Sequence, residues 1–133
     1  MQLSASEITL HVTVTHVVVG SGPVRCAAYT SERTFLTREG IHVGQSHEAN
    51  ADEVTMLLAV PAGQPVAISV FQDTNSNESL DRGAFGIPSE PWGFSGKPGA
   101  FGPPRWKDCV ITPTPGQAVV IALRGGGATR PRE

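Results

Sequence analysis

The chain lacks any cluster of basic residues and any long apolar run. Its 133 residues carry 10 Lys and Arg against 12 Asp and Glu, a formal net charge of −2. Nucleic-acid binding needs clustered Lys and Arg, so we expect no nucleic-acid partner. No apolar stretch approaches the roughly 18 residues of a membrane span. Residues 1–7 show neither the basic nor the apolar region of a signal peptide, which predicts a cytoplasmic protein or one whose leader was removed.

Cysteine is also scarce, since Cys26 and Cys109 are the two in the sequence. Each stands in an apolar run, where a buried free Cys behaves as a small hydrophobe. We therefore favour free core thiols over a disulfide. A cysteine metal site is not expected, because no second ligand pair stands at the usual short spacing.

No amphipathic helix of useful length is visible, and the dominant hydrophobic period is two. This period and the turn residues between the runs predict about seven short strands, at residues 8–14, 24–29, 41–47, 54–60, 65–71, 109–112 and 118–123. Residues 30–40 predict a loop or one short helical turn. The pattern predicts an all-β fold, an antiparallel β-sandwich of the immunoglobulin-like or transthyretin-like kind. We expect one domain over residues 1–124 and a flexible tail over 125–133.

The segment 71–108 has no regular hydrophobic period. It holds both tryptophans and four of the five phenylalanines among many Gly and Pro residues. Long loops in small domains are usually functional or disordered, and disordered segments are poor in aromatics. A functional site is therefore expected here.

An acidic turn opens this segment. Oxygen-bearing side chains stand at alternating positions, as in an EF-hand-like loop: Asp73, Asn75, Asn77, Ser79 and Asp81. Such spacing on a tight turn can direct several oxygens at one calcium ion, with the backbone carbonyl oxygen of Ser79 as one of the ligands. The sequence therefore predicts a weak calcium-type site.

The turn departs from a full calcium loop at two positions. Glu78 stands where a glycine normally allows the sharp turn, and Ala84 stands where a bidentate Glu is usual. Glu78 or Glu90 would then supply the missing carboxylate. The alternative is that the Asp and Asn side chains only build Asx-turns between two strands.

Five segments together resemble one known family. They are residues 22–29 (GPVRCAAY), 66–77 (VAISVFQDTNSN), 85–88 (FGIP), 93–95 (GFS) and 101–104 (FGPP). In this order they resemble the bacterial family called domain of unknown function 2141. The resemblance implies a small exported β-sandwich protein without an assigned activity. Two positions differ from its usual pattern: Gln72 replaces a common His, and Glu78 a common Gly.

The aromatic part of the segment allows two interpretations. Trp92, Phe94, Phe101 and Trp106 could form a stacking platform for a small molecule or a carbohydrate. They could equally fold inward and cap one end of the sandwich as a satellite core.

Three functions remain open. The first is a non-catalytic binding module that uses the aromatic surface. The second is a small enzyme in which Asp73 or Asp81 acts as general base and Arg105 stabilises developing negative charge. The sequence has no Gly-x-Ser-x-Gly elbow to support nucleophilic catalysis. The third is a structural or interaction module without a small ligand.

Overall fold

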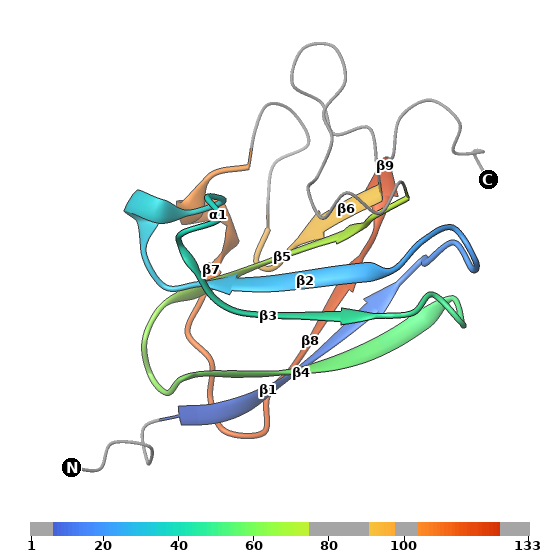
Figure 1. Cartoon of the computed structure of the whole chain (residues 1–133). Helices are drawn as coiled ribbons and strands as arrows, with labels where there is room; N and C mark the ends of the chain where they lie inside the picture. Colours follow the sequence, from blue (N-terminus) through green and yellow to red (C-terminus); the bar gives the residue numbers. More distant parts are fainter. Residues whose placement is uncertain (1–6, 75–90, 98–103, 126–133) are drawn as a thin grey trace.

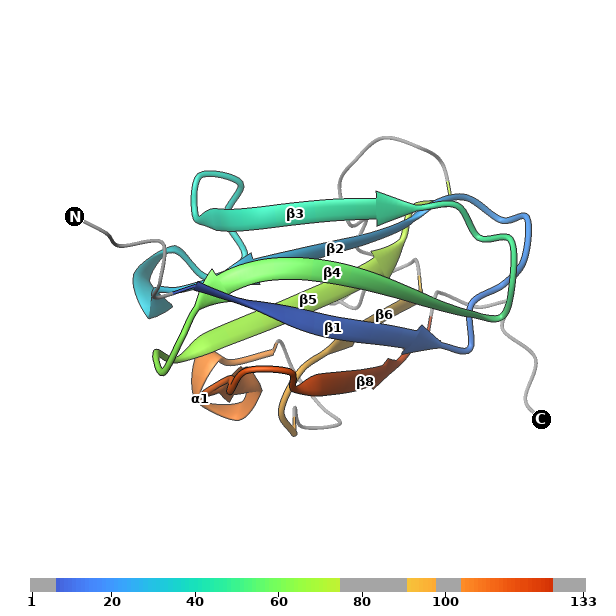
Figure 2. The same ribbon diagram turned by 90° about the horizontal axis from the view of Figure 1, so that it is seen from below.

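The computed structural model describes residues 7–74, 91–97 and 104–125, which form two facing β-sheets (Figures 1 and 2). The small sheet has the order β4-β1-β8 and contains β1 (Glu7–Thr15), β4 (Glu53–Pro61) and β8 (Ala118–Ala122). The large sheet has the order β3-β2-β5-β6-β9, and β7 also pairs with β5. Its strands are β2 (Val24–Tyr29), β3 (Ile41–His47), β5 (Val66–Gln72), β6 (Pro91–Phe94), β7 (Val110–Ile111) and β9 (Arg124–Gly125). The predicted all-β sandwich is confirmed.

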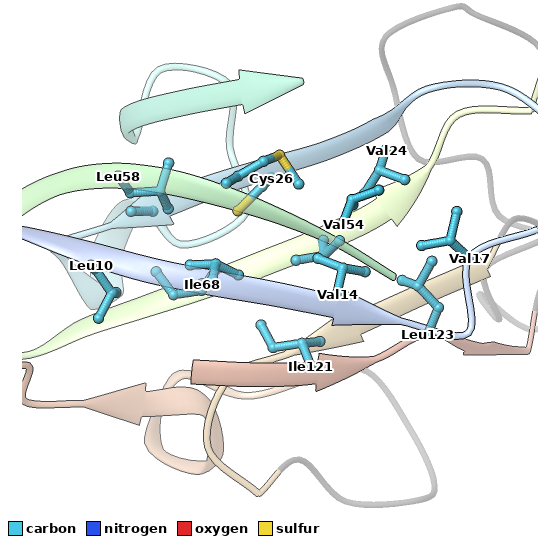
Figure 3. Packing of buried hydrophobic residues seen from close by; sticks show 14 of the residues in the cluster. Leu10, Val14, Val17, Val24, Cys26, Val54, Leu58, Ile68, Ile121 and Leu123 are labelled. Carbon is cyan, nitrogen blue, oxygen red and sulfur yellow. The ribbon is translucent and has the colours of Figure 1, made fainter. Parts of the chain in front are cut away.

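The main core lies between the two sheets, as Figure 3 shows. In β1, Leu10, Val12 and Val14 are fully buried, while the residues between them are exposed or half-buried. Strand β4 alternates in the same way. A strand turns successive side chains to opposite faces, so the period of two in the sequence directs one apolar face of each strand into this core.

The strand directions differ in one place from a wholly antiparallel sandwich. Strands β1 and β4 are antiparallel along their whole length, from Glu7 opposite Pro61 to Thr15 opposite Glu53. Strand β8 runs parallel to β1, from His11 opposite Ala118 to Thr15 opposite Ala122. The small sheet is therefore mixed. Hydrophobic alternation indicates which face of a strand is buried, and it does not indicate the direction of its neighbour.

Residues 71–108 were predicted as one long loop. Their two described stretches after the acidic turn, residues 91–97 and 104–108, contain regular structure. Pro91–Phe94 forms β6, which pairs with β5, and Trp106–Cys109 forms the short helix α1. The described residues thus hold nine strands, two of them only two residues long, where about seven were predicted. Strand β6 was missed because Gly93 is its inward residue, and a Cβ there would overlap Ile121.

A second hydrophobic cluster lies on the outer face of the large sheet. Its buried members are Ala67, Phe94 and Cys109, and partly buried residues packed against it are Phe35, Leu36, Trp92 and Trp106. A short 3₁₀ helix, Glu32–Thr34, lies near α1 at the same end of this sheet (Figure 1). It confirms the helical turn expected within residues 30–40. Among the described residues, no helix has the length and apolar character that crossing a membrane requires.

Candidate functional site

The strand register arranges the outer face of the large sheet in three rows of side chains. Residues directly opposite each other on paired strands share a face. The first row is formed by Ser46, Arg25, Phe71, Trp92 and Arg124, the second by Gly44, Ala27, Ser69 and Phe94, and the third by Ile41, Tyr29, Ala67 and Val110. The middle row is therefore small on β3, β2 and β5, and on β2 it lies between the large side chains of Arg25 and Tyr29.

This difference in side-chain size creates a groove of about 710 Å³ across β3, β2 and β5. Its floor is made by Gly44, Ala27 and Ser69, and Phe94 lines one wall. Strands lie about 4.8 Å apart, and residues four apart on one strand are separated by about 13 Å. The floor is thus roughly 10 Å across three strands, between Arg25 and Tyr29 at the two sides.

The residues 30–40, here called the rim loop, supply Leu36, Thr37 and Arg38 to the lining of the groove. The Ser31 hydroxyl accepts a hydrogen bond from the Arg33 N–H at 3.3 Å and caps the 3₁₀ helix. The Thr37 hydroxyl donates to the Thr34 carbonyl at 2.8 Å. These bonds fold the polar stretch tightly over the sheet.

Gly40 closes the rim loop. Its N–H donates to the Thr37 carbonyl at 3.1 Å, and a Cβ at this position would overlap both the backbone oxygen and the side chain of Thr34. Only a glycine fits at this position, so Gly40 allows the end of the rim loop to pack closely against Thr34.

Arg25 is held at the groove by Asp73. Its Nε donates to Asp73 Oδ2 at 2.8 Å; the Arg25 side chain is 26% exposed and that of Asp73 is fully buried. The Asp73 N–H donates to the Pro23 carbonyl at 2.8 Å. Gly22, at φ +120°, allows this approach because a Cβ would overlap the Asp73 carbonyl. Asp73, predicted as a calcium ligand or a general base, is thus an ion-pair partner that does not line the groove.

Gln72, at the position where the resembled family commonly has His, is fully buried. Its Oε1 accepts from the Val18 N–H at 2.9 Å, and its Nε2 donates to the carbonyls of Val18 and Gly22 at 2.6 and 3.0 Å. These bonds attach the turn before β2 to the end of β5. The side chain has a structural role beside Asp73.

The predicted aromatic platform is divided in the structure. Phe94 lines the groove and is 7% exposed, whereas Trp92 and Trp106 are partly buried in the second cluster. Phe35 connects them, with its ring centroid 6.3 Å from Phe94 and 5.7 Å from Trp106. Phe101 lies outside the described residues. Most of this group therefore packs as a satellite core, which was the alternative interpretation.

Trp92 sits between two different contacts. Its ring centroid is 5.5 Å from Phe94, and the Arg124 guanidinium carbon lies 4.9 Å from the Trp92 ring centroid. Its indole N–H is buried and has no acceptor among the described residues. Trp92 does not line the groove.

The remaining predicted residues are not brought together in the described part of the chain. Arg105 is exposed, and its Nε lies 3.5 Å from Asp108 Oδ2 one helical turn away, a surface pair of small energetic value. Within residues 7–74, 91–97 and 104–125, no three His, Cys, Asp or Glu side chains gather as metal ligands. The candidates Asn75, Asn77, Ser79 and Asp81 lie outside these residues, as do Glu78, Ala84 and Glu90.

Both cysteines are free and buried, which confirms the preference for core thiols. Cys26 belongs to the main core and Cys109 to the second cluster. Burial raises the pKa of the Cys26 thiol from 9.0 to about 12. Burial, with a smaller contribution from the Asp108 charge, raises the pKa of Cys109 to about 11. Neither thiol is ionised near neutral pH, so neither is an activated nucleophile.

Several residues of the groove were missed by sequence reasoning. Arg25, Ala27 and Tyr29 share one face by the period of two, as do Ser69 and Phe71. This alternation could have shown a small residue between two large ones on the outer face of β2. The pairing of β2 with β3 and β5 was needed to extend that gap into a groove.

The two sheets and the groove define a small β-sandwich domain with a solvent-facing concavity on its larger sheet. The family model described as an uncharacterized protein conserved in bacteria (DUF2141) matches residues 12–120. The chain belongs to this family, as the resemblance of its motifs implied. No curated protein and no solved structure matches it.

Proposed function

We propose that this protein is a non-catalytic module that binds a small organic molecule in the groove on the large sheet. The observation that carries the proposal is the groove of about 710 Å³ with a floor of Gly44, Ala27 and Ser69. Larger side chains line its two sides, Arg25 and Phe71 on one and Tyr29 and Ile41 on the other. This volume lies within the range of small-molecule sites, which combine apolar walls with a few polar groups.

The chemistry of the lining favours binding over catalysis. Among the described residues that line the groove there is no carboxylate and no histidine, the usual groups for acid–base catalysis near neutral pH. Cys26 is also a lining residue, but its side chain is buried in the main core and the pKa of its thiol is about 12. Burial raises the pKa of Tyr29 as well, and a side-chain hydrogen bond with Ser69 offsets part of this effect. The enzyme hypothesis with Asp73, Asp81 and Arg105 gains no support from these contacts.

A neutral fluorescent probe, N-phenyl-1-naphthylamine, tests the proposal directly. We expect the wild-type protein to raise its fluorescence saturably, and Gly44→Leu to weaken binding about tenfold or more. A Cβ at Gly44 would meet the Cys26 carbonyl oxygen at 3.5 Å and Ile41 Cγ2 at 3.7 Å, which is ordinary contact. The added side chain therefore occupies the groove without displacing the backbone.

Ala59→Leu is the matched control. Ala59 is exposed on β4, in the small sheet, so the same enlargement there should leave probe binding unchanged. Absence of saturable binding, or equal loss in both variants, would refute the groove as the site. A carbohydrate is the other occupant that the sequence suggested, and a glycan array would test it on the same two variants.

The calcium-type site in residues 73–81 also remains a proposal. Asp73 is its one described ligand, and the Arg25 guanidinium bound to that carboxylate opposes a cation by charge repulsion. A thermal melt of chelator-stripped protein tests the site. A calcium-selective rise of Tm by about 5–10 °C at a hundredfold excess over Kd would support it. No change at millimolar calcium would reject it.

Two finer assignments belong to the same proposal. The two facing sheets support an immunoglobulin-like or transthyretin-like topology. The family resemblance supports an exported protein, and fractionation of the cells that produce it would test this location.

A further inference from the structure

We infer that the ligand of the groove is an organic anion, with an apolar body over the floor and a carboxylate, sulfonate or phosphate at Arg38. This inference rests on the proposed function and adds the chemical class of the ligand. It follows from the charges of the lining, from the way Arg25 is held, and from the position of the rim loop.

The charged side chains that line the groove are all positive among the described residues. Arg25 and Arg38 both line the groove, and no described lining residue is acidic. A concave surface with charges of one sign attracts ligands of the opposite sign, and its walls of low dielectric strengthen the attraction.

The two arginines differ in how they are held. Arg25 is held through Nε by the buried carboxylate of Asp73, which offsets much of its charge. A guanidinium has five N–H donors, so the bond from Nε still leaves Arg25 able to donate at the groove. Arg38 is exposed on the rim loop, and no ion pair to a described carboxylate is found for it. The net positive charge of the groove therefore resides mainly at Arg38.

The apolar body of the ligand is indicated by the floor and the walls. Ala27 and Gly44 present almost no side chain, so a flat group can approach the sheet closely, while Phe71 and Phe94 provide aromatic contact. Leu36 and Ile41 add aliphatic surface near Arg38. An apolar group with one anionic end matches this arrangement, whereas a polyhydroxylated ligand would leave these walls without a partner.

A pair of probes that differ in one charge tests the inference. The compound 8-anilinonaphthalene-1-sulfonate is N-phenyl-1-naphthylamine with one added sulfonate, so the two share an apolar body. We expect the sulfonate to bind the wild-type protein about fivefold more tightly than the neutral probe at low salt. This preference should shrink at 0.5 M salt, where charges are screened within a few ångströms.

Variants in the rim loop localise the effect. Arg38→Gln should abolish the preference for the sulfonate, so that the two probes bind the variant with about equal affinity. Arg33→Gln is the matched control, because Arg33 is exposed in the same loop and does not line the groove. Urea unfolding of both variants would verify that each is folded.

The outcomes separate this inference from the proposed function. Equal affinity for the two probes, or a preference that survives Arg38→Gln, would overturn the anionic ligand while the groove still binds apolar molecules. If neither probe binds, or if Gly44→Leu changes nothing, the proposed function fails and the inference with it.

Discussion

At the scale of single residues, two buried polar side chains at the end of β5 hold distant parts of the chain together. Gln72 bonds to Val18 and Gly22, and Asp73 bonds to Arg25 and Pro23. Buried polar groups are stabilising only when they are hydrogen-bonded. Each of these side chains therefore holds the start of β2 against the end of β5, beside the groove.

We predict that Gln72→Leu lowers the free energy of unfolding by about 2–4 kcal/mol. The substitution removes three hydrogen bonds of about 1 kcal/mol each and leaves the Val18 N–H without its acceptor. Urea unfolding measures the change. Gln64→Leu, at an exposed position of the β4–β5 turn, should stay within about 0.5 kcal/mol. A loss at Gln72 no larger than at Gln64 would show that the bonds contribute little.

The buried thiols predict a loss of stability in alkaline solution. The Cys26 pKa is about 12 in the folded protein and 9.0 as its ordinary value. Between these two pH values the unfolded chain loses the thiol proton and the folded chain keeps it. Below pH 9 both states are protonated, so stability is unaffected there and falls as pH rises above 9. The raised pKa values of Cys109 and Tyr29 act in the same direction.

Urea unfolding between pH 8 and pH 11 measures this dependence. Each such thiol should lower the free energy of unfolding by up to about 1.4 kcal/mol per pH unit above pH 9. Cys26→Ala removes one titrating group, so its curve should be less steep than the wild-type curve. Identical slopes would mean that Cys26 ionises as easily in the folded protein as in the unfolded chain.

At the scale of elements, the rim loop determines the shape of the groove. Its 3₁₀ helix and the turn at Thr37 fold against the second cluster, where the Phe35 ring centroid lies 5.4 Å from that of Tyr29. Leu36 holds φ +68°, a conformation that costs about 1 kcal/mol or more for a residue with a side chain. The surrounding contacts must offset this cost, so packing holds the rim loop in a defined conformation at the groove.

We predict opposite effects of adding a methyl group at two glycines of this region. Gly40→Ala should destabilise the protein by about 1–3 kcal/mol, because the Cβ overlaps Thr34. Gly44→Ala meets only ordinary contacts and should be neutral or stabilising by up to about 1 kcal/mol, since glycine weakens a strand. Urea midpoints of the two variants provide the comparison. Equal destabilisation would show that Thr34 yields to the added methyl group.

At the scale of the whole molecule, the large sheet carries apolar packing on both of its faces. The main core fills the space between the sheets (Figure 3), and the smaller second cluster covers part of the outer face. Apolar burial is the dominant stabilising contribution and is roughly proportional to the area removed from water. The smaller cluster should therefore open at a lower free energy than the main core.

The two cysteines report separately on these two clusters. In native protein at pH 8, we expect iodoacetamide to label Cys109 at least about tenfold faster than Cys26, which corresponds to about 1.4 kcal/mol of opening free energy. The rates should converge as urea brings on global unfolding. Mass spectrometry of the labelled peptides measures both sites in one sample. Equal rates at every urea concentration would show that the two faces open as one unit.

Much of this architecture was predictable, because strand positions and buried faces depend on the pattern of residues close together in the sequence. The alternation in residues 8–14 and 54–60 predicted β1 and β4 with the correct buried face, and the apolar runs around Cys26 and Cys109 predicted buried thiols. The short strand β6 was not predictable in this way. Its four residues include Gly93, whose burial depends on Ile121 of another strand.

The sequence by itself determined the class of fold, because the period of two and the turn residues act locally. It also determined the family, through motifs spread over most of the chain. Tertiary structure alone decided the strand register, the parallel pairing of β1 with β8 and the ion pair between Arg25 and Asp73, 48 residues apart. The groove arises from that register, because only the alignment of Gly44, Ala27 and Ser69 across three strands leaves the space open. Such alignments depend on contacts between residues far apart in the chain, which no local pattern encodes.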